Sequence, residues 1–320
     1  MYEPLKMHPC YKDYLWGGNR LKKEFGKADA LEKTAESWEL AALPDGVSTV
    51  ESGDYKGMTL NTLAQRDRAG FWGMNCQGEQ FPLLVKLIDA NQSLSIQVHP
   101  SDDTALSEFG EHGKAEMWYI VDCEPQAYLY LGFSRKTTRE EFLQRAQNGT
   151  ICDILNRVPV SRGDVFYILP GTIHAIGKGI LIAEIQQSSN TTFRIYDYRR
   201  KDSSGNLRPL HLERASQVLS YDPIVPEECK SNTEVYFPEF QMCEMFSCRY
   251  FRSYRIDVQV GVTLNCDGQS FHHVLCVEGA GKICAGNKAY SLGRGDSYFM
   301  PAALGKYHIQ GECRILLSHI

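Results

Sequence analysis

The sequence lacks the long apolar segments that mark a membrane protein or a secreted precursor. Apolar runs such as PLLVKLIDA at 82–90 are broken by Lys86 and Asp89, well short of the roughly 20 residues that span a bilayer. The stretch MYEPLKMHPCYKDYLWGG at 1–18 contains no apolar core of signal-peptide length. We therefore expect no membrane partner and a cytoplasmic location.

The cysteines lack the spacing of a redox motif or a cysteine-rich metal site. There are eleven, an odd number, and no two of them form a CxxC pair. Dispersed cysteines in a chain without a secretion signal favour reduced thiols. We interpret all eleven as small hydrophobic residues of the core.

The chain also lacks a strong charge of one sign. Its net charge is −5 over 320 residues, which argues against nucleic acid or an anionic membrane as a partner. This balance leaves room for a local basic pocket that binds a small anion. A hydrophobic content of 43% is ordinary for a globular protein, and the length favours two domains. We expect a monomer or a homodimer.

What the sequence does contain, from residue 81 onward, is a series of short strands separated by polar turns. One helical segment, predicted at about 137–157, interrupts the series. It opens with Thr138 and Glu141 in capping-box spacing, and Gly149 lies where a helix C-cap is expected. The pattern therefore predicts an all-β dominated fold, a sandwich or barrel, with a short helical insertion.

An internal repeat divides this series. RGDVFYILPGTIHAIGKG at 162–179 is similar to RGDSYFMPAALGKYHIQG at 294–311. Both resemble the second half of the cupin barrel signature, in which a metal-binding His lies eleven residues after the Gly. Gly163 leads to His174, whereas Gly295 leads to Lys306. We predict two cupin (jelly-roll) barrels, a catalytic one at 1–220 and a degenerate one at 221–320.

The preceding strands repeat as well. AEMWYIVDC at 115–123 aligns with FHHVLCVEG at 271–279, which places Glu116 opposite His272 and Met117 opposite His273. The first copy thus keeps a candidate metal set and the second has lost it. We interpret His272, His273 and His308 as structural or surface residues.

Alternation along the strands gathers the candidate ligands. Ser95, Gln97 and His99 share one face of SLSIQVHP at 93–100, and Lys114 and Glu116 share one face of another strand. A barrel brings such faces together.

Two imidazoles, from His99 and His174, with the Glu116 carboxylate and the Gln97 amide form a mixed N/O set that suits zinc. A single strand His is more often a polar residue satisfied by its neighbours. It is the combination that indicates a metal, and it leaves open whether Gln97 binds the ion or borders it.

The stretch GILIAEIQQSSNTTFRIYDYRR at 179–200 adds charged candidates. Glu184 lies on the polar face of its strand, and Arg194 follows between Phe193 and Ile195. An Arg between apolar neighbours either points into a cleft or pairs with a carboxylate, here Glu184 or Asp197.

These motifs carry a resemblance. QVHP, GKAEMWYIVD, ESWEL and the stretch from 170 to 200 resemble the type I mannose-6-phosphate isomerase family in its shorter bacterial form. The resemblance implies one zinc ion per chain and interconversion of mannose 6-phosphate and fructose 6-phosphate. It also implies metal ligands at Gln97, His99, Glu116 and His174, an active-site Arg194, and substrate contacts at Ser95 and Lys114. Asn190 departs from the family, which commonly has Asp there.

The chemistry of such an isomerisation needs a proton carrier and an anion site. Glu184, His99 or a zinc-bound water could move the proton, and Arg194 can stabilise an oxyanion. Ser95, Lys114 and Lys86 are candidates for the phosphate, although Lys86 could instead reach the surface. Two other functions stay open, a metal-dependent cupin oxygenase and a non-catalytic sugar-phosphate-binding cupin.

Overall fold

The computed structural model describes residues 2–109, 112–202, 204–229 and 233–320. Strands account for 44% of the chain and helices for 16%, which confirms the all-β dominated prediction. None of the eleven cysteines, all in the described part, forms a disulfide. Within these ranges, no helix is long and apolar enough to cross a membrane.

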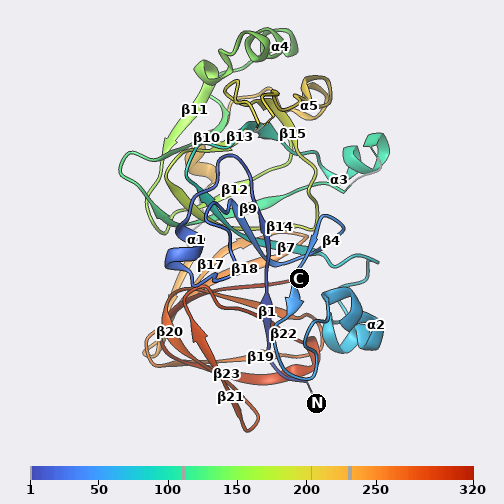
Figure 1. The fold of residues 1–320 in the computed structure, drawn as a ribbon, viewed down its shortest axis with the longest axis vertical. Helices are drawn as coiled ribbons and strands as arrows, with labels where there is room; N and C mark the ends of the chain where they lie inside the picture. Colours follow the sequence, from blue (N-terminus) through green and yellow to red (C-terminus); the bar gives the residue numbers. More distant parts are fainter. Residues whose placement is uncertain (1, 110–111, 203, 230–232) are drawn as a thin grey trace.

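Two antiparallel sheets, here called the N-terminal sheets, occupy the upper half of the molecule in Figure 1. The six-stranded sheet has the order β12 (Val165–Ile168), β9 (Glu116–Cys123), β14 (Ile180–Gln187), β7 (Leu83–Ala90), β3 (Glu36–Leu40) and β2 (Cys10–Lys12). The five-stranded sheet has the order β11 (Leu155–Pro159), β10 (Tyr128–Phe133), β13 (His174–Ile176), β8 (Ile96–Val98) and β15 (Phe193–Tyr196).

The central strands of the six-stranded sheet are buried on both faces. Every residue of β7 and of β14 is buried, which explains why these strands read as near-continuous apolar runs. The register places Glu184 of β14 between Lys86 of β7 and Trp118 of β9. Charged side chains are thereby held in the middle of a buried sheet, where they need partners.

The predicted helical segment is correct over most of its length. Helix α4 (Arg139–Asn148) begins at Thr138, whose side chain accepts from the Glu141 N–H, and ends at Gly149 with φ 77°. A 3₁₀ turn, Ile151–Ile154, follows. Residues 155–157 are not helical, because Leu155–Pro159 pairs with β10 as strand β11. Helix α5 (Leu212–Val218), which the sequence pattern did not predict, contacts α4 and β15.

A ten-stranded sheet, here called the C-terminal sheet, forms the lower half in Figure 1. Its strands are β16 (Thr233–Tyr236), β17 (Phe240–Ser247), β18 (Arg252–Val258), β23 (Gly305–His319), β20 (His272–Ala285), β22 (Ser297–Met300), β1 (Leu5–His8) and β6 (Thr49–Val50), with β19 (Gly261–Cys266) on β23 and β21 (Lys288–Gly293) on β20. Strands β1 and β6 come from the start of the chain. The division at 220 stays a prediction.

The two regions share a strand register. Glu116 pairs with Ile168 across β9 and β12, and His272 pairs with Met300 across β20 and β22. Each second partner lies five residues after its turn glycine, Gly163 or Gly295, and both glycines have φ 91°. Only glycine adopts this backbone without strain. The register therefore supports the internal repeat.

Short elements connect these sheets. They are α1 (Arg20–Glu24), β4 (Ala42–Leu43), β5 (Gly46–Val47), α2 (Leu60–Phe71), α3 (Asp102–Thr104), the π-helical turn Ala105–Phe109, and the 3₁₀ turns Pro226–Cys229 and Ala302–Leu304.

Candidate metal centre and cavity

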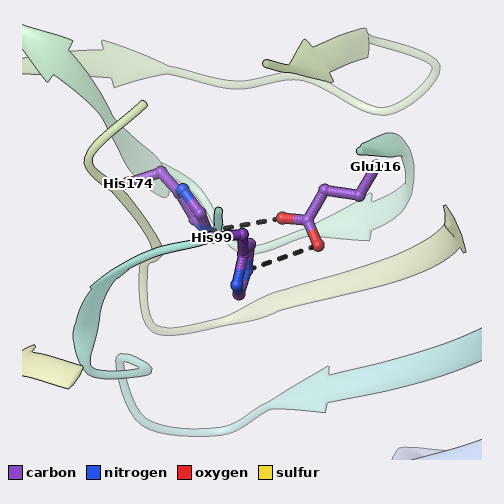
Figure 2. Close-up of side chains that lie close together, drawn as sticks. All are labelled: His99, Glu116 and His174. Atoms are coloured by element: carbon purple, nitrogen blue, oxygen red, sulfur yellow. Dashed lines mark ion pairs between the residues drawn. The ribbon is translucent and has the colours of Figure 1, made fainter. Parts of the chain in front are cut away.

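Three predicted ligands meet inside the N-terminal sheets. The Nε2 atoms of His99 and His174 lie 3.6 Å and 3.3 Å from the two carboxylate oxygens of Glu116, and Figure 2 shows both rings turned toward that carboxylate. Two ligands bound to zinc at about 2.1 Å in tetrahedral geometry lie about 3.4 Å apart. The observed spacing therefore fits one metal ion.

Backbone carbonyls fix both imidazoles for metal binding. His99 Nδ1 lies 2.8 Å from the carbonyl oxygen of Thr191, and His174 Nδ1 lies 2.8 Å from that of Thr172. Because a carbonyl only accepts, each Nδ1 carries the proton and each Nε2 presents a lone pair to Glu116. A ligating His commonly donates its second ring nitrogen in this way.

Burial and neighbouring charge set the protonation of the group. All three side chains are buried, with exposed fractions of at most 1%. Burial lowers the pKa of His174 to about 4 and that of His99 well below its ordinary value, with Lys114 adding to both shifts. Burial raises the pKa of Glu116 to about 7, against the opposing effect of Lys114. Neutral imidazoles beside an ionisable carboxyl are what a divalent cation requires.

Neither Glu116 oxygen accepts a well-aligned hydrogen bond from the described residues. A fully buried carboxylate needs a compensating charge, and here Lys114 Nζ approaches Oε2 to 2.7 Å. The same ammonium lies 3.3 Å from His99 Nε2. Gln97, predicted as a fourth ligand, borders the group, with Nε2 3.4 Å from His174 Nε2.

A cavity of about 230 Å³ opens beside this cluster. All the remaining predicted site residues line it, namely Lys86, Ser95, Gln97, Lys114, Glu184 and Arg194. The structure thus brings the metal, substrate and catalytic candidates into one place, while their individual roles stay predictions.

Lys86 and Glu184 form a buried ion pair in the cavity wall. Lys86 Nζ lies 3.0 Å from Glu184 Oε1, and the indole N–H of Trp118 donates to Glu184 Oε2 at 2.8 Å. Lys86 is 3% exposed, which excludes the surface position considered from the sequence. Burial alone would raise the pKa of Glu184, but Lys114 and Lys86 together lower it to about 2.

Arg194 lies on β15, opposite Gln97 of β8. Its Nη1 donates to the carbonyl oxygen of Pro209 at 2.9 Å. In the described part of the chain it makes no ion pair with Glu184, and Asp197 pairs instead with Arg200 and Arg208. Arg194 therefore faces the cavity rather than a structural carboxylate.

The sequence did not indicate several cavity residues. These are Tyr14, Trp16, Glu36, Ile88, Leu94, Asn190, Thr192 and Arg208. The Glu36 carboxylate lies 3.7 Å from Lys86 Nζ. Glu36 belongs to the ESWEL motif, which indicated the family but did not indicate that this carboxylate faces the cavity. Asn190, the departure from the family pattern, donates to Asp45 at 2.8 Å.

The C-terminal sheet holds no comparable cluster among the described residues. At the position that corresponds to Glu116, His272 Nδ1 lies 2.9 Å from the Tyr307 hydroxyl. His273 Nε2 lies 2.9 Å from Ser297 Oγ, and His308 Nδ1 lies 3.0 Å from Thr263 Oγ1. All three contacts agree with the predicted structural role of these histidines.

Paired antiparallel sheets around a buried His–Glu–His cluster define a cupin-like protein with a candidate metal centre. A model for the phosphomannose isomerase type I catalytic domain matches residues 5–128, and one for the mannose-6-phosphate isomerase cupin domain matches residues 241–320.

The relatives extend this match over the full length. The chain is 39% identical to mannose-6-phosphate isomerase ManA of Bacillus subtilis, over 99% of each chain. It is 38% identical to mannose-6-phosphate isomerase of Streptococcus mutans, over 100% of this chain and 99% of that one. A crystal structure of the mannose 6-phosphate isomerase from Bacillus subtilis superposes with a TM-score of 0.92 at 35% identity, over 99% of each chain. The chain belongs to the type I phosphomannose isomerase family, which confirms the predicted resemblance and fold class.

Proposed function

We propose that the protein interconverts mannose 6-phosphate and fructose 6-phosphate with one zinc ion per chain. The observation that carries the proposal is the buried cluster of His99, Glu116 and His174. It contacts Gln97 and Lys114, which line the polar cavity. His99, Glu116 and His174 would hold the ion, with Gln97 as a candidate fourth ligand. When bound, zinc supplies Lewis-acid polarisation of the sugar oxygens.

The charge of the cavity supports a phosphorylated substrate. Its lining includes four cations, Lys86, Lys114, Arg194 and Arg208, against two carboxylates, Glu36 and Glu184. The difference, four minus two, leaves two positive charges to attract a phosphate that carries close to two negative charges at neutral pH. This local basic pocket is what the overall charge of −5 had left room for.

Moving a carbonyl between C1 and C2 requires loss of the proton next to it and stabilisation of an enediolate oxygen. We assign the oxyanion to Arg194, a permanent cation whose Nε has no hydrogen-bond partner among the described residues. We propose that Lys114 fixes the reacting end of the sugar, because it contacts both His99 and Glu116.

The surroundings of Glu184 argue against its predicted role as the proton carrier. A carboxylate with a pKa of about 2 stays charged at neutral pH and accepts a proton weakly. Both its oxygens already face donors, Lys86 and Trp118. We therefore propose that Glu184 acts chiefly by orienting Lys86 and Lys114. A water molecule is then the proton carrier, because His99 uses Nδ1 for the Thr191 carbonyl and Nε2 for the ion.

An assay that couples fructose 6-phosphate formation to a detectable product tests the proposal. We expect turnover of mannose 6-phosphate, its loss after chelation and its return with zinc. No turnover with zinc present would overturn it. Oxygen consumption would instead support the cupin oxygenase, and binding without turnover the sugar-phosphate-binding cupin. The cytoplasmic location and the choice between monomer and homodimer stay predictions.

A further inference from the structure

The cations of the cavity are not equivalent, because carboxylates surround some of them and not others. At one end, Lys86 and Lys114 meet three carboxylates, those of Glu36, Glu116 and Glu184. With all three carboxylates ionised, as a bound metal ion requires of Glu116, two positive and three negative side-chain charges give this end −1. The lysines are thus already compensated by their own protein partners.

The other end has the opposite balance. Arg208, which lines the cavity, shares Asp197 with Arg200, which lies behind the lining. Arg194 adds a third positive charge close to them and makes no ion pair of its own among the described residues. Three guanidinium groups against one carboxylate leave a net charge of +2. A divalent cation at the other end would raise that end only to +1, so the arginine end stays the stronger attractor of an anion.

Arg208 combines this charge with a donor that points to no protein acceptor. Its Nε and Nη2 donate to the two oxygens of Asp197 at 2.8 Å and 2.6 Å. Among the described residues, Nη1 donates no hydrogen bond. The side chain is 20% exposed and lines the cavity. The fork is therefore held on one edge and available on the other, the arrangement that suits a phosphate oxygen.

The backbone that carries Arg208 is fastened to the active-site strand. Arg194 Nη1 donates to the Pro209 carbonyl, the His211 N–H donates to the Arg194 carbonyl at 2.7 Å, and the Arg194 N–H donates to His211 Nδ1 at 3.0 Å. These three bonds tie the segment after Arg208 to β15. The guanidinium is thus positioned before substrate arrives, which reduces the entropy lost on binding.

We infer that Arg208, positioned by Asp197, binds the phosphate group of the substrate, and that Lys86 and Lys114 serve the reacting end instead. Arg194, which lies between Gln97 and the segment that carries Arg208, serves the reacting end with them. The inference rests on the proposed function only in that the phosphate belongs to a sugar. It moves the phosphate site away from the lysines favoured by the sequence. It also gives a role to a residue that the sequence motifs did not indicate.

The test compares Arg208→Gln with Arg199→Gln, which removes the same charge from an exposed position on the same segment. For Arg208→Gln we expect the KM for mannose 6-phosphate to rise about 10- to 100-fold, because a charge-assisted bond to phosphate is lost. We expect kcat to stay within about threefold. The inhibition constant of inorganic phosphate should rise in parallel. Arg199→Gln should change KM by no more than about twofold, as exposed charges contribute little.

Two further variants separate charge from position. Arg208→Lys keeps the charge without the fork and should give an intermediate KM. Asp197→Asn makes the site more positive, so attraction alone would lower KM, whereas loss of positioning raises it. KM does not depend on the folded fraction of the enzyme, so partial misfolding does not obscure either result.

The inference is overturned if Arg208→Gln leaves KM unchanged, lowers kcat alone, or matches the effect of Arg199→Gln. A lower KM in Asp197→Asn overturns the positioning role. If the unsubstituted protein turns over no mannose 6-phosphate, the isomerase proposal fails by itself. Calorimetric titration of inorganic phosphate into the unsubstituted protein and Arg208→Gln then still decides whether Arg208 forms the anion site.

Discussion

The N-terminal sheets and the C-terminal sheet share a turn and a strand register but carry different side chains at the corresponding positions. In the first, Glu116 and His174 meet His99 in a buried cluster. In the second, the corresponding positions hold His272, which contacts the Tyr307 hydroxyl, and Lys306, which is exposed. The Gly-Asp turn and the strand pairing serve the fold in both regions. The metal set is therefore an addition to this scaffold, and the scaffold persists without it.

Replacing the corresponding residue in each copy of the repeat tests this comparison most strongly. We expect Glu116→Ala to lower kcat/KM by about 1,000-fold or more, because Lewis-acid stabilisation is worth several kcal/mol. The matched variant His272→Gln should retain near-normal kcat/KM. Steady-state kinetics with zinc in excess measures both, and equal losses in the two variants would refute the division of roles.

A second buried lysine–carboxylate pair lies between the two regions, where Lys27 contacts Glu39 of β3 and the Gly295 carbonyl beside β22. We expect it to match the Lys86–Glu184 pair in its effect on stability but not in its effect on activity. Lys86→Met and Lys27→Met each remove the paired cation from a buried glutamate. In one case this is Glu184, which keeps only Lys114 at 3.8 Å, and in the other it is Glu39. We expect both to lower the free energy of unfolding by about 3–5 kcal/mol. Denaturant unfolding gives these values.

Only Lys86→Met should also lower kcat per folded molecule, since Lys27 lies against Glu39 and the Gly295 carbonyl, away from the cavity. A comparable fall in kcat for Lys27→Met would show that the two regions are functionally coupled.

The buried imidazole of His273 in the C-terminal sheet should make the stability of the protein fall at acidic pH. Burial, with a smaller effect of Lys27, lowers the pKa of His273 to about 3, against an ordinary value of 6.5. The unfolded chain therefore binds this proton first as the pH falls, so the stability contributed by neutral His273 is present above pH 6.5 and is lost toward pH 3.

Replacing His273 with Gln should flatten this acid loss by up to about 1.4 kcal/mol per pH unit within that window. Unfolding curves at a series of pH values measure the difference between the two proteins. Parallel curves would mean that His273 titrates alike in the folded and unfolded chains.

The smallest expected effect concerns the helix that only the N-terminal sheets carry. Thr138→Ala removes the side-chain acceptor for the Glu141 N–H and should cost about 1 kcal/mol of unfolding free energy. The kinetic constants should not change, because Thr138 does not line the cavity. A change in KM would indicate that α4 contributes to substrate binding.

Features set by residues close together in the sequence were predicted better than features set by distant residues. Strand alternation and the Gly-to-His spacing are local patterns, and they indicated His99, Glu116 and His174, which the structure brings together. The ends of the helical segment were also set locally, by Thr138 and Gly149. Residues 155–157 were assigned wrongly because their strand partner, β10, lies some 25 residues away in sequence.

The cavity residues that the sequence missed are positioned by distant partners. Glu36 reaches the cavity because the register of β3 and β7 brings it close to Lys86. Arg208 is held at the cavity because Asp197 binds its guanidinium. In the same way, LLVKLID did not reveal that Lys86 is buried. A strand lysine that reaches the surface and one that is buried give the same alternation in the sequence.

Metal content tests the central claim most directly. Elemental analysis of purified protein after zinc loading and removal of free metal should give one zinc per chain for the unsubstituted protein and for His272→Gln, and none for Glu116→Ala. Zinc retained in full by Glu116→Ala, or lost from His272→Gln, would contradict the assignment of the metal centre to the N-terminal sheets.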